Sequence, residues 1–397
     1  MDALEGIRIL ELARVAPGEL CTLLLADMGA DVLKIETPPA APPAGEEDRR
    51  AAFSFLNRNK RSLALNLKDP EGQALFQRLA AGADVIVEGF RPGVTKRLGV
   101  DYETIRAINP RIVYCSLSGF GQDGPYRDYP AHDMNYLSLA GVLGLIGEAG
   151  SRKPVIPLNL VADYAGASLH GALGVVLALF ARERTGRGQH VDVSYLDTTI
   201  SLLAATPNMR FFFSDGTAPR RGEGALGGSY PYYAIYETRD GKLLTIGCTE
   251  PWLWVNFCKA IGRPDFARFA RATDHFVRAA NAEEVGAREA IEAIIRTRDR
   301  DEWFDLLVRH DVCVGKVHDV EEMVRDPQVL HRGMIVEAEH PTAGKVRQFG
   351  IAIKLGETPG RIRHLGPRTG EHTDETLRGL GLGDEDIRRL RERRTVA

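Results

Sequence analysis

The first 36 residues alternate between short apolar runs and one helix pattern, and this order constrains the fold more than any other stretch. Residues 7–12 (Ile-Arg-Ile-Leu-Glu-Leu) and 31–36 (Asp-Val-Leu-Lys-Ile-Glu) are typical of strands. Between them, residues 20–28 predict a buried helix that Gly29 ends, as a glycine commonly does. Strand, helix and strand form a β-α-β unit, so we expect a parallel sheet with ligands at the carboxyl ends of its strands.

The same alternation continues after this unit. Residues 84–88 and 112–117 read as further strands, and residues 70–81 and 102–108 show helical patterns. The first turn lacks the Gly-x-Gly-x-x-Gly fingerprint of dinucleotide-binding folds, which argues against a nicotinamide enzyme.

A Pro- and Gly-rich stretch at 206–227 predicts a linker. After it, Arg239-Asp240-Gly241 separates two strand-like runs and predicts a β-hairpin. The segments that follow are typical of a small α+β domain and then of a return to the first one. They are helices at 251–261, 280–296 and 301–309, strands at 334–338 and 350–355, and a C-terminal helix that begins with residues 369–377. The last residues are basic, and we expect them to be solvated.

Composition excludes several classes of protein. The chain has 397 residues, of which 44% are hydrophobic and 26% charged, and a formal net charge of -3, so neither a nucleic-acid nor a membrane partner is expected. No apolar run is long and unbroken enough to span a membrane, and the N-terminus does not resemble a signal peptide, so we expect a cytoplasmic protein. The five cysteines form no Cys-x-x-Cys pair and are expected to be mostly buried, reduced thiols.

Asp163 is the first candidate catalytic residue. It opens a long run of small and apolar residues, which predicts a helix buried on nearly every face. An acidic residue at a helix start can simply cap free N–H groups. Alternatively, the same N–H groups can face a developing enolate oxygen.

His132 is the second candidate, in a predicted turn between Pro130 and Asp133. An isolated histidine near a strand end is more often structural, yet its titration near neutral pH suits proton transfer. His170 competes with it, but its place within the predicted buried helix favours a packed residue.

Two further sets of residues have both a structural and a functional interpretation. The basic segments 59–62 and 89–97, with Lys68, suit phosphate groups, and Phe90 can stack on a purine; the alternative is a solvated charged surface. Glu250 follows an apolar strand and is either a helix cap or a partner for a catalytic group from the other domain.

Together these segments resemble the family III CoA-transferase superfamily, which includes formyl-CoA transferase, the carnitine CoA-transferase group and α-methylacyl-CoA racemase. The resemblance covers almost the whole chain, and the ordered set is far more specific than any single motif. The matching segments are residues 4–11, 27–36, 59–62, 68–72, 83–85, 91–94, 118–125, 183–189 and 370–373.

The resemblance implies an α/β fold: a Rossmann-like parallel-sheet large domain that binds coenzyme A and is built from both chain ends, plus a small α+β domain. It also implies an interlocked homodimer, in which each chain threads through the other. The expected divisions are 1–205 and 346–397 for the large domain, 228–328 for the small domain, and linkers at 206–227 and 329–345.

Two chemistries for Asp163 follow from the resemblance. In the transferases, the matching aspartate attacks the acyl-CoA thioester and forms a mixed anhydride, then an aspartyl-CoA thioester. In the racemases it exchanges a proton in concert with a histidine, in a segment that residues 131–136 (Ala-His-Asp-Met-Asn-Tyr) closely match. Residues 227–233 and Thr249-Glu250-Pro251 also resemble racemase segments, although the former carries one extra residue.

We therefore expect an α-methylacyl-CoA racemase-like isomerase that inverts C2 of 2-methylacyl-CoA thioesters through an enolate. His132 and Asp163 would flank C2, Glu250 would orient His132, and N–H groups at the Asp163 helix would hold the enolate oxygen. No metal or redox cofactor is expected. Positional matches to the family assign the coenzyme A moiety of the substrate to Ala16, Leu65, Lys68, Phe90, Arg91 and Arg97.

Several alternatives stay open. A CoA-transferase that acts through Asp163 is the first, and a non-catalytic CoA-binding paralogue is the second. Thr37 departs from the arginine commonly found beside the adenine in this family. The sequence does not identify the acyl chain, which could be a branched fatty acid, a bile-acid precursor or a small arylpropionyl group. Phe211, Phe212, Phe213 and Trp252 could line its pocket, although core packing is the commoner role of such aromatics.

Overall fold

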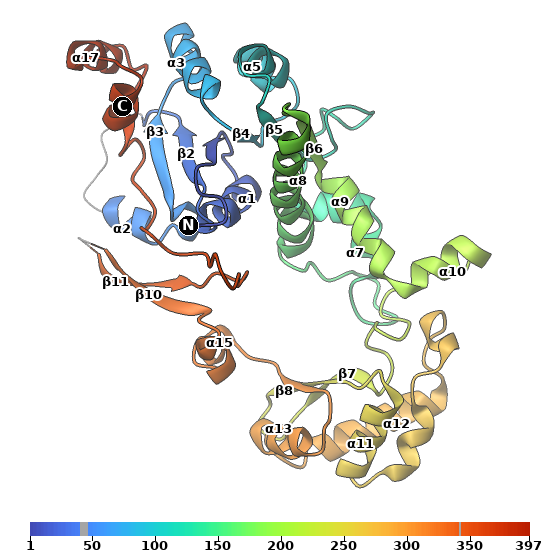
Figure 1. Cartoon of the computed structure of the whole chain (residues 1–397). Coiled ribbons are helices and arrows are strands. Elements are labelled where there is room, and N and C mark those ends of the chain that lie inside the picture. The colour runs from blue at the N-terminus through green and yellow to red at the C-terminus, as the bar shows by residue number, and fades with distance from the viewer. Residues whose placement is uncertain (40–46, 341–342) are drawn as a thin grey trace. The chain divides into compact units, whose positions relative to one another are not determined.

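The computed structural model describes residues 1–39, 47–340 and 343–397, which form two compact units (Figure 1). The first unit contains Met1–Tyr136, Asn159–Thr199 and Val324–Ala397, so it combines both chain ends. The second contains Leu137–Leu158 and Ile200–Met323. Two of the divisions, at 199/200 and 323/324, fall near the linkers expected at 206–227 and 329–345, whereas those at 136/137 and 158/159 fall within the stretch 1–205 expected for the large domain. The two expected linkers contain regular elements, among them α10 (Pro207–Asp215) and β10 (Ile335–His340).

The first unit is built on a parallel sheet, as the β-α-β pattern predicts. Its described strands pair in the order β3-β2-β1-β4-β5-β6. The order reverses between β1 and β4, and in such folds ligands bind beyond the carboxyl ends of the strands at this switch point. The strands are β1 (Arg8–Glu11), β2 (Asp31–Glu36), β3 (Lys60–Ala64), β4 (Val85–Glu88), β5 (Val113–Ser118) and β6 (His190–Ser194).

Helices cover both faces of this sheet (Figure 1). On one face, α3 (Pro70–Ala81), α5 (Tyr102–Ile108), α16 (Thr373–Gly379) and α17 (Asp384–Glu392) enclose a core that includes Leu33, Phe76 and Leu390. On the other face lie α1 (Ala16–Asp27) and α8 (Leu169–Thr185), which contact each other. The bounds of α3 and α5 agree with the prediction. Asp69 caps α3 by accepting a hydrogen bond from the Glu71 N–H, and Pro70 starts the helix.

Strands β3 and β6 were not anticipated, and β3 corrects the interpretation of the basic segment 59–62. Lys60 is fully buried, and its Nζ lies 2.8 Å from Glu11 Oε2, which is buried too. Arg61 Nη2 lies 2.8 Å from Asp31 Oδ2, on the neighbouring strand β2. These cations stabilise the sheet through ion pairs, so neither a phosphate site nor a solvated surface describes the segment.

The second unit contains the predicted hairpin. Strands β7 (Tyr233–Glu237) and β8 (Leu243–Gly247) pair antiparallel around Gly241, whose φ of 74° suits glycine. A third strand, β9 (Val314–Lys316), extends the sheet. Buried aromatic residues such as Trp254 and Phe257 join it to α11 (Pro251–Ala260), α12 (Ala282–Ile295) and α13 (Arg300–Arg309).

Near the C-terminal end, two predictions need correction. The strand expected at 350–355 is absent, because β10 pairs with β11 (Gly344–Phe349) and the pairing ends at Phe349. The helix α17 was not predicted. The remaining helices are α2 (Glu47–Ala52), α4 (Val94–Arg97), α6 (Asp133–Leu139), α7 (Val142–Leu145), α9 (Tyr195–Leu202), α14 (Val320–Met323) and α15 (Pro327–His331), with 3-10 turns at Phe55–Asn57, Leu203–Ala205, Pro264–Phe269 and Thr273–Phe276.

Four of the five cysteines are buried and Cys313 is exposed, and none is in a disulfide. This agrees with the expected thiols. Burial raises the pKa of the Cys21 thiol to about 12, so this residue is an inert core group.

The helix Leu160–Thr185 corrects two expectations. By length and composition it could cross a membrane, contrary to the prediction that the chain has no such run. It is also not buried on every face. Gly171, Ala172 and Val175 are buried, but Leu173 and Leu177 are 55% and 57% exposed. Core helices meet the same length and composition test, and the buried face of this helix contacts α1, β5 and β6.

Candidate active site and coenzyme pocket

Asp163 lies in a π-helical segment, Leu160–Ser168, that leads directly into α8. Gly166 allows α9 to approach closely, because a Cβ there would lie only 3.0 Å from Thr198 Oγ1. Side chains satisfy carbonyls of the widened turns. Ser168 Oγ donates to the Asp163 carbonyl at 3.0 Å, and His170 Nδ1 lies 2.6 Å from the Gly166 carbonyl, so His170 is engaged by its own helix. Single π turns inside α-helices are rare and are frequent at functional sites.

Asp133 caps the start of this segment. Its Oδ2 accepts hydrogen bonds from the N–H groups of Ala162 and Asp163, both at 2.9 Å, and the residue is 4% exposed. The interpretation of Asp163 as the cap is therefore wrong. The expectation that these N–H groups hold an enolate oxygen is wrong for Ala162 and Asp163, since Asp133 occupies both.

The segment Ala131–Tyr136 holds His132 in place. The Asn135 side chain accepts from the His132 N–H at 3.0 Å, and the Asn135 N–H donates to the His132 carbonyl at 2.8 Å. Tyr136 Oη donates to the Ala131 carbonyl at 2.8 Å, and its ring packs edge-on against Tyr195. His132 itself is exposed. The Asn135 and Tyr136 side chains thus fix the backbone that presents the imidazole.

The two candidate catalytic groups interact electrostatically. Burial raises the pKa of the half-buried Asp163 carboxyl above its usual value. A hydrogen bond from Asn159 Nδ2, 3.2 Å away, lowers this pKa, the charge of Asp133 raises it and His132 lowers it. A carboxyl whose proton affinity is raised, close to an exposed imidazole, is suited to proton exchange with a substrate.

Glu250 belongs to the second unit, so its partnership with His132 stays a prediction. It occupies the N-cap position of α11, yet its side chain makes no capping hydrogen bond. Instead Glu250 Oε2 accepts from Thr249 Oγ1 at 2.9 Å. The alternative interpretation of Glu250 as a side-chain cap is therefore wrong.

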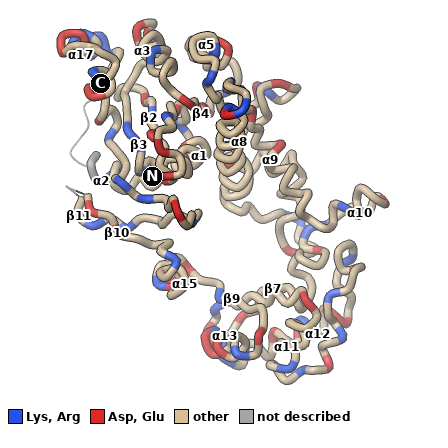
Figure 2. Tube along the Cα trace, in the orientation of Figure 1, with Lys and Arg blue, Asp and Glu red and all other residues tan. Residues whose placement is uncertain are grey.

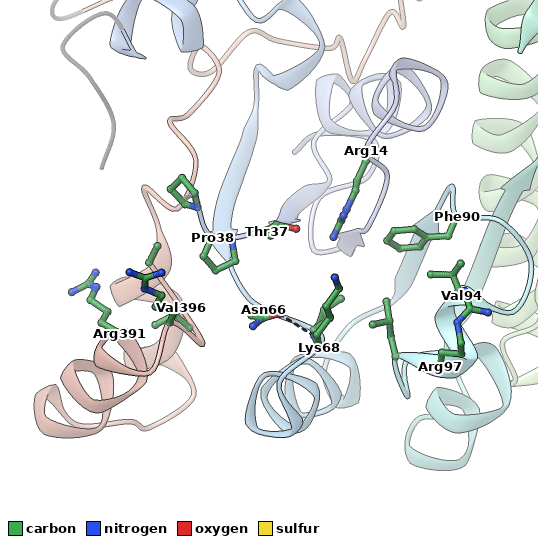
Figure 3. Close-up of a pocket in the computed structure, with 15 residues that line it drawn as sticks. Arg14, Thr37, Pro38, Asn66, Lys68, Phe90, Val94, Arg97, Arg391 and Val396 are labelled. Atoms are coloured by element: carbon green, nitrogen blue, oxygen red, sulfur yellow. Dashed lines mark hydrogen bonds between the residues drawn. The ribbon is translucent and has the colours of Figure 1, made fainter. Parts of the chain in front are cut away.

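A cavity of about 1000 Å³ opens at the carboxyl ends of β1, β2, β3 and β4 (Figure 3). Arg14 and Lys68 point toward each other across it, and the Arg14 guanidinium carbon lies 5.3 Å from the centre of the Phe90 ring. Like charges that converge on an open space indicate an anion site. The cavity is lined by Arg14, Thr37, Pro38, Pro39, Asn66, Leu67, Lys68, Phe90, Val94, Arg97, Leu98, Arg391, Arg394, Val396 and Ala397.

Three of the six residues assigned to coenzyme A line this cavity, namely Lys68, Phe90 and Arg97. Leu65 is 2% exposed and precedes the lining residue Asn66, while Ala16 is the first residue of α1. Arg91 is outside the lining, but its charge reaches Tyr136 on the His132 segment. Burial raises the pKa of Tyr136 to about 12, and Arg91 opposes this rise.

Sequence reasoning missed Arg14, Asp133, and the arginines near the C-terminal end. The position of Arg14 in the sequence could have indicated a ligand contact, because it follows β1 at the carboxyl edge of the sheet. The position of Asp133 could have indicated a role in the site, since it directly follows His132. Arg391 and Arg394 were expected to be solvated, and only the folded chain shows that they border the same cavity as Lys68.

Glu88, two residues before Phe90, has a buried carboxyl and is 3% exposed. Its Oε2 accepts from the Phe90 N–H at 2.8 Å, and the side chain also bonds Ser116. Burial raises the pKa of Glu88 to about 7, against these hydrogen bonds, and the charge of Asp192 raises it further. Glu88 therefore anchors the loop that carries Phe90 into the cavity.

Comparison with known proteins agrees with this geometry. CoA-transferase family III matches residues 4–373 of the chain. The chain belongs to this family. Among similar curated proteins, the α-methylacyl-CoA racemase of Homo sapiens is 35% identical, with 98% of this chain and 96% of that protein covered.

Transferases of the family are similar to nearly the same degree. The succinyl-CoA–L-malate CoA-transferase beta subunit of Chloroflexus aurantiacus is 34% identical over 99% of this chain and 98% of its own length. A solved structure of a CAIB/BAIF family protein from Brucella suis matches with a TM-score of 0.77 and 27% identity, covering 96% of this chain and 99% of that one. This enzyme family therefore includes both racemases and transferases among the relatives of the chain.

Proposed function

We propose that this enzyme racemises 2-methylacyl-CoA thioesters at C2. The observation that carries the proposal is the link that Asp133 makes between the two candidate bases. Asp133 directly follows His132, and its carboxylate holds the N–H of Asp163 at 2.9 Å. An exposed imidazole and a carboxyl of raised pKa are thereby kept in one site. A 1,1-proton transfer needs one group that removes a proton from C2 and a second group that donates one to it.

The proposed reaction moves one proton off C2 and returns one to it. One of the two groups removes the α-proton, and the electron pair of the C–H bond passes into the thioester as an enolate. The other group then donates a proton to the opposite face of C2. The roles of His132 and Asp163 exchange for the other enantiomer. The enolate oxygen needs donors other than the N–H groups of Ala162 and Asp163, because Asp133 holds those.

The cavity near Phe90 supports acyl-CoA as the substrate. Coenzyme A carries an adenine, a diphosphate and a 3′-phosphate, and the cavity offers cations with apolar walls between them. We place the diphosphate between Arg14 and Lys68, whose side chains converge there (Figure 3). Arg91 directly follows Phe90, and its charge acts on Tyr136 of the His132 segment. This link fits a substrate that extends from the cavity to the acid/base pair.

The deciding experiment follows exchange of the C2 hydrogen in deuterated water, with a panel of 2-methylacyl-CoA enantiomers and no acceptor acid present. The wild-type enzyme should incorporate deuterium and interconvert the enantiomers. His132→Ala should reduce both by at least about 100-fold, since general acid/base groups typically contribute 10²–10⁴-fold. His310→Asn, at an exposed histidine of the second unit, is the matched control and should leave both rates unchanged. Full activity in His132→Ala would contradict the two-base scheme.

A CoA-transferase is the second candidate, because transferases are as similar to this chain as racemases are. Asp163 accepts only one side-chain hydrogen bond among those described, from Asn159, so its carboxylate is open to attack a thioester carbonyl. Attack would release the CoA thiolate and leave an acyl–aspartyl anhydride. The thiolate would then attack the aspartyl carbonyl and release the acid. Hydroxylamine added with acyl-CoA should trap Asp163 only if this route operates.

We further propose that the enzyme is a homodimer. The helix Leu160–Thr185 exposes apolar side chains along one face, and Figure 2 shows little charge along α8 until its final turn. A continuous apolar face of this kind marks an interaction surface in a protein that is not in a membrane. A second copy of the chain fits the family expectation of interlocked subunits. The exposed side chains are Leu160, Leu169, Leu173, Val176, Leu177 and Phe180.

A further inference from the structure

Cations border the coenzyme cavity at two ends. Arg14, Lys68 and Arg97 come from loops and helices that follow β1, β3 and β4. At the side of the cavity near Val396, a different part of the chain supplies Arg391 (Figure 3). Arg394, two residues before Val396, also lines the cavity. We call residues 391–397 the tail. Pro38, Leu67 and Val396 give the cavity an apolar wall alongside these charges.

The tail is held firmly against the sheet. Val396 is 2% exposed and forms a β-bridge with Leu65. The Asn66 N–H donates to the Thr395 carbonyl at 2.8 Å, and Thr395 Oγ1 bonds Asp69. These contacts hold the tail against residues 65–69, a segment that also lines the cavity. The position of the tail arginines is therefore set by the core and not by free motion of a chain end.

Arg394 occupies an unusual conformation between α17 and the β-bridge. Its φ is 57°, in the left-handed region that side chains other than glycine and asparagine rarely adopt. Its N–H donates to the Arg391 carbonyl at 2.9 Å, and the next N–H, of Thr395, donates to Leu390. The left-handed residue and these two hydrogen bonds form the C-cap of α17, a common way for a helix to end, and they fix the point at which the Arg394 side chain leaves the backbone.

The two tail arginines differ in their charge balance. Arg391 Nη2 lies 2.6 Å from Asp374 Oδ1, so a carboxylate already compensates it. The Arg394 guanidinium has no ion pair or hydrogen bond to another residue that the structure describes, although it borders the cavity. An arginine without an anionic partner, next to an apolar wall, is suited to bind a phosphate group.

We propose that Arg394 binds the 3′-phosphate of coenzyme A, with Arg391 beside it, and so makes the enzyme discriminate coenzyme A from 3′-dephospho-coenzyme A. The proposal rests on the proposed function only in taking coenzyme A as the carrier. Coenzyme A has two phosphate-bearing parts separated by a ribose and next to an adenine. The cavity has two separate groups of cations, and the group at Arg14 and Lys68 is assigned to the diphosphate. The tail arginines then remain to bind the other dianionic group, the 3′-phosphate.

The test compares binding of coenzyme A and 3′-dephospho-coenzyme A to the full chain by calorimetry. Arg394→Asn retains a residue that tolerates the left-handed conformation, so the tail backbone should keep its fold. This variant should bind coenzyme A roughly 10- to 100-fold more weakly than wild type, the loss typical of a charged hydrogen bond. It should bind 3′-dephospho-coenzyme A as well as wild type does. Arg394→Lys should recover part of the discrimination.

Arg388→Asn is the matched control. Arg388 lies on α17, pairs with Glu385 and Glu392, and does not border the cavity, so both affinities should stay unchanged. Equal losses for both ligands in Arg394→Asn, or no loss for either, would overturn the proposal while leaving the proposed function intact. Failure of the wild-type enzyme to bind either ligand would instead refute the coenzyme A site itself. Thermal melting of each variant separates loss of binding from loss of fold.

Discussion

At the residue scale, Asp133 both shapes and tunes the acid/base site. It caps Ala162 and Asp163, and its charge raises the pKa of Asp163, after the larger effect of burial. Asp133→Asn keeps a side-chain oxygen for the two N–H groups but removes the charge. The pKa of Asp163 should fall, so its carboxylate form should persist to lower pH. The acidic limb of the pH–rate profile should therefore move to lower pH, measured as kcat/KM for C2 exchange.

A carboxylate outside the site provides the control for Asp133. Asp128→Asn alters an exposed residue of the preceding loop, and its pH–rate profile should match that of wild type. Asp133→Ala removes the cap as well, and a lost cap typically costs about 0.5–2 kcal/mol of stability. An unchanged acidic limb in Asp133→Asn would show that Asp133 does not act on Asp163.

Glu88 gives a second prediction at this scale, on stability. Its pKa is raised from 4.5 to about 7 by burial in the folded protein. The unfolded chain binds this proton less tightly, so the folded state gains from protonation of Glu88. That contribution is fully present below about pH 4.5 and is lost as the pH rises through about 7. It amounts to on the order of 3 kcal/mol.

Glu88→Gln should remove this pH dependence. The amide oxygen can still accept from the Phe90 N–H, so the loop that carries Phe90 should be kept. Denaturant unfolding at pH 5 and pH 8 should show that the variant gains stability relative to wild type as the pH rises. Glu103→Gln, at an exposed carboxyl on α5, should give the same difference between the two pH values as wild type. Parallel behaviour of Glu88→Gln and wild type would contradict the raised pKa.

At the element scale, the π-helical segment depends on Gly166. A Cβ there would lie 3.0 Å from Thr198 Oγ1 and 3.2 Å from the Val161 carbonyl, which is backbone and cannot rotate away. Gly166→Ala should therefore displace the segment that carries Asp163, lower kcat, and destabilise the fold by about 1–3 kcal/mol. Thermal unfolding and exchange rates measure both effects.

Gly286→Ala in α12 is the opposite case. It is a helical glycine whose added Cβ meets nothing within 4 Å, so the free energy of unfolding of the variant should rise by up to about 1 kcal/mol. If Gly166→Ala behaved like Gly286→Ala, the packing of α9 against the π-helical segment would not constrain Asp163.

How far the sequence predicts these elements depends on where the deciding interaction lies. Alternation and caps are local, so α3, α5 and the β7–β8 hairpin were predicted with nearly the correct bounds. Strand β3 was missed because its lysine and arginine look solvated, whereas partners on β1 and β2 neutralise them. The sequence leaves a capping role open for Asp163, because the carboxylate that does cap the segment, Asp133, is 30 residues away in the chain.

At the scale of the whole molecule, the coenzyme cavity shows the same limit. The sequence itself indicates Lys68, Phe90 and Arg97 as candidates for phosphate and purine binding, and the family resemblance assigns them to coenzyme A. All three come from the N-terminal part of the chain. Arg394 borders the cavity because Val396 and Thr395 bond to Leu65, Asn66 and Asp69, across more than 300 residues of sequence. The pattern of basic residues along the sequence does not predict such a pairing. The sites formed by both chain ends are therefore those for which the structure adds most.

The last prediction concerns the assembly of the molecule. Leu173 and Leu177 are more than half exposed on the apolar face of α8, and the proposed homodimer would bury them. Leu177→Lys should weaken self-association by at least about tenfold, because it removes about 1.5–3 kcal/mol of apolar burial and places a charge in the interface. Sedimentation velocity across a concentration series measures the change. Ile108→Lys, 42% exposed at the end of α5, is the control and should leave association unchanged. A wild-type chain that stays monomeric at all concentrations would refute the homodimer and would leave this apolar face without the partner assigned to it.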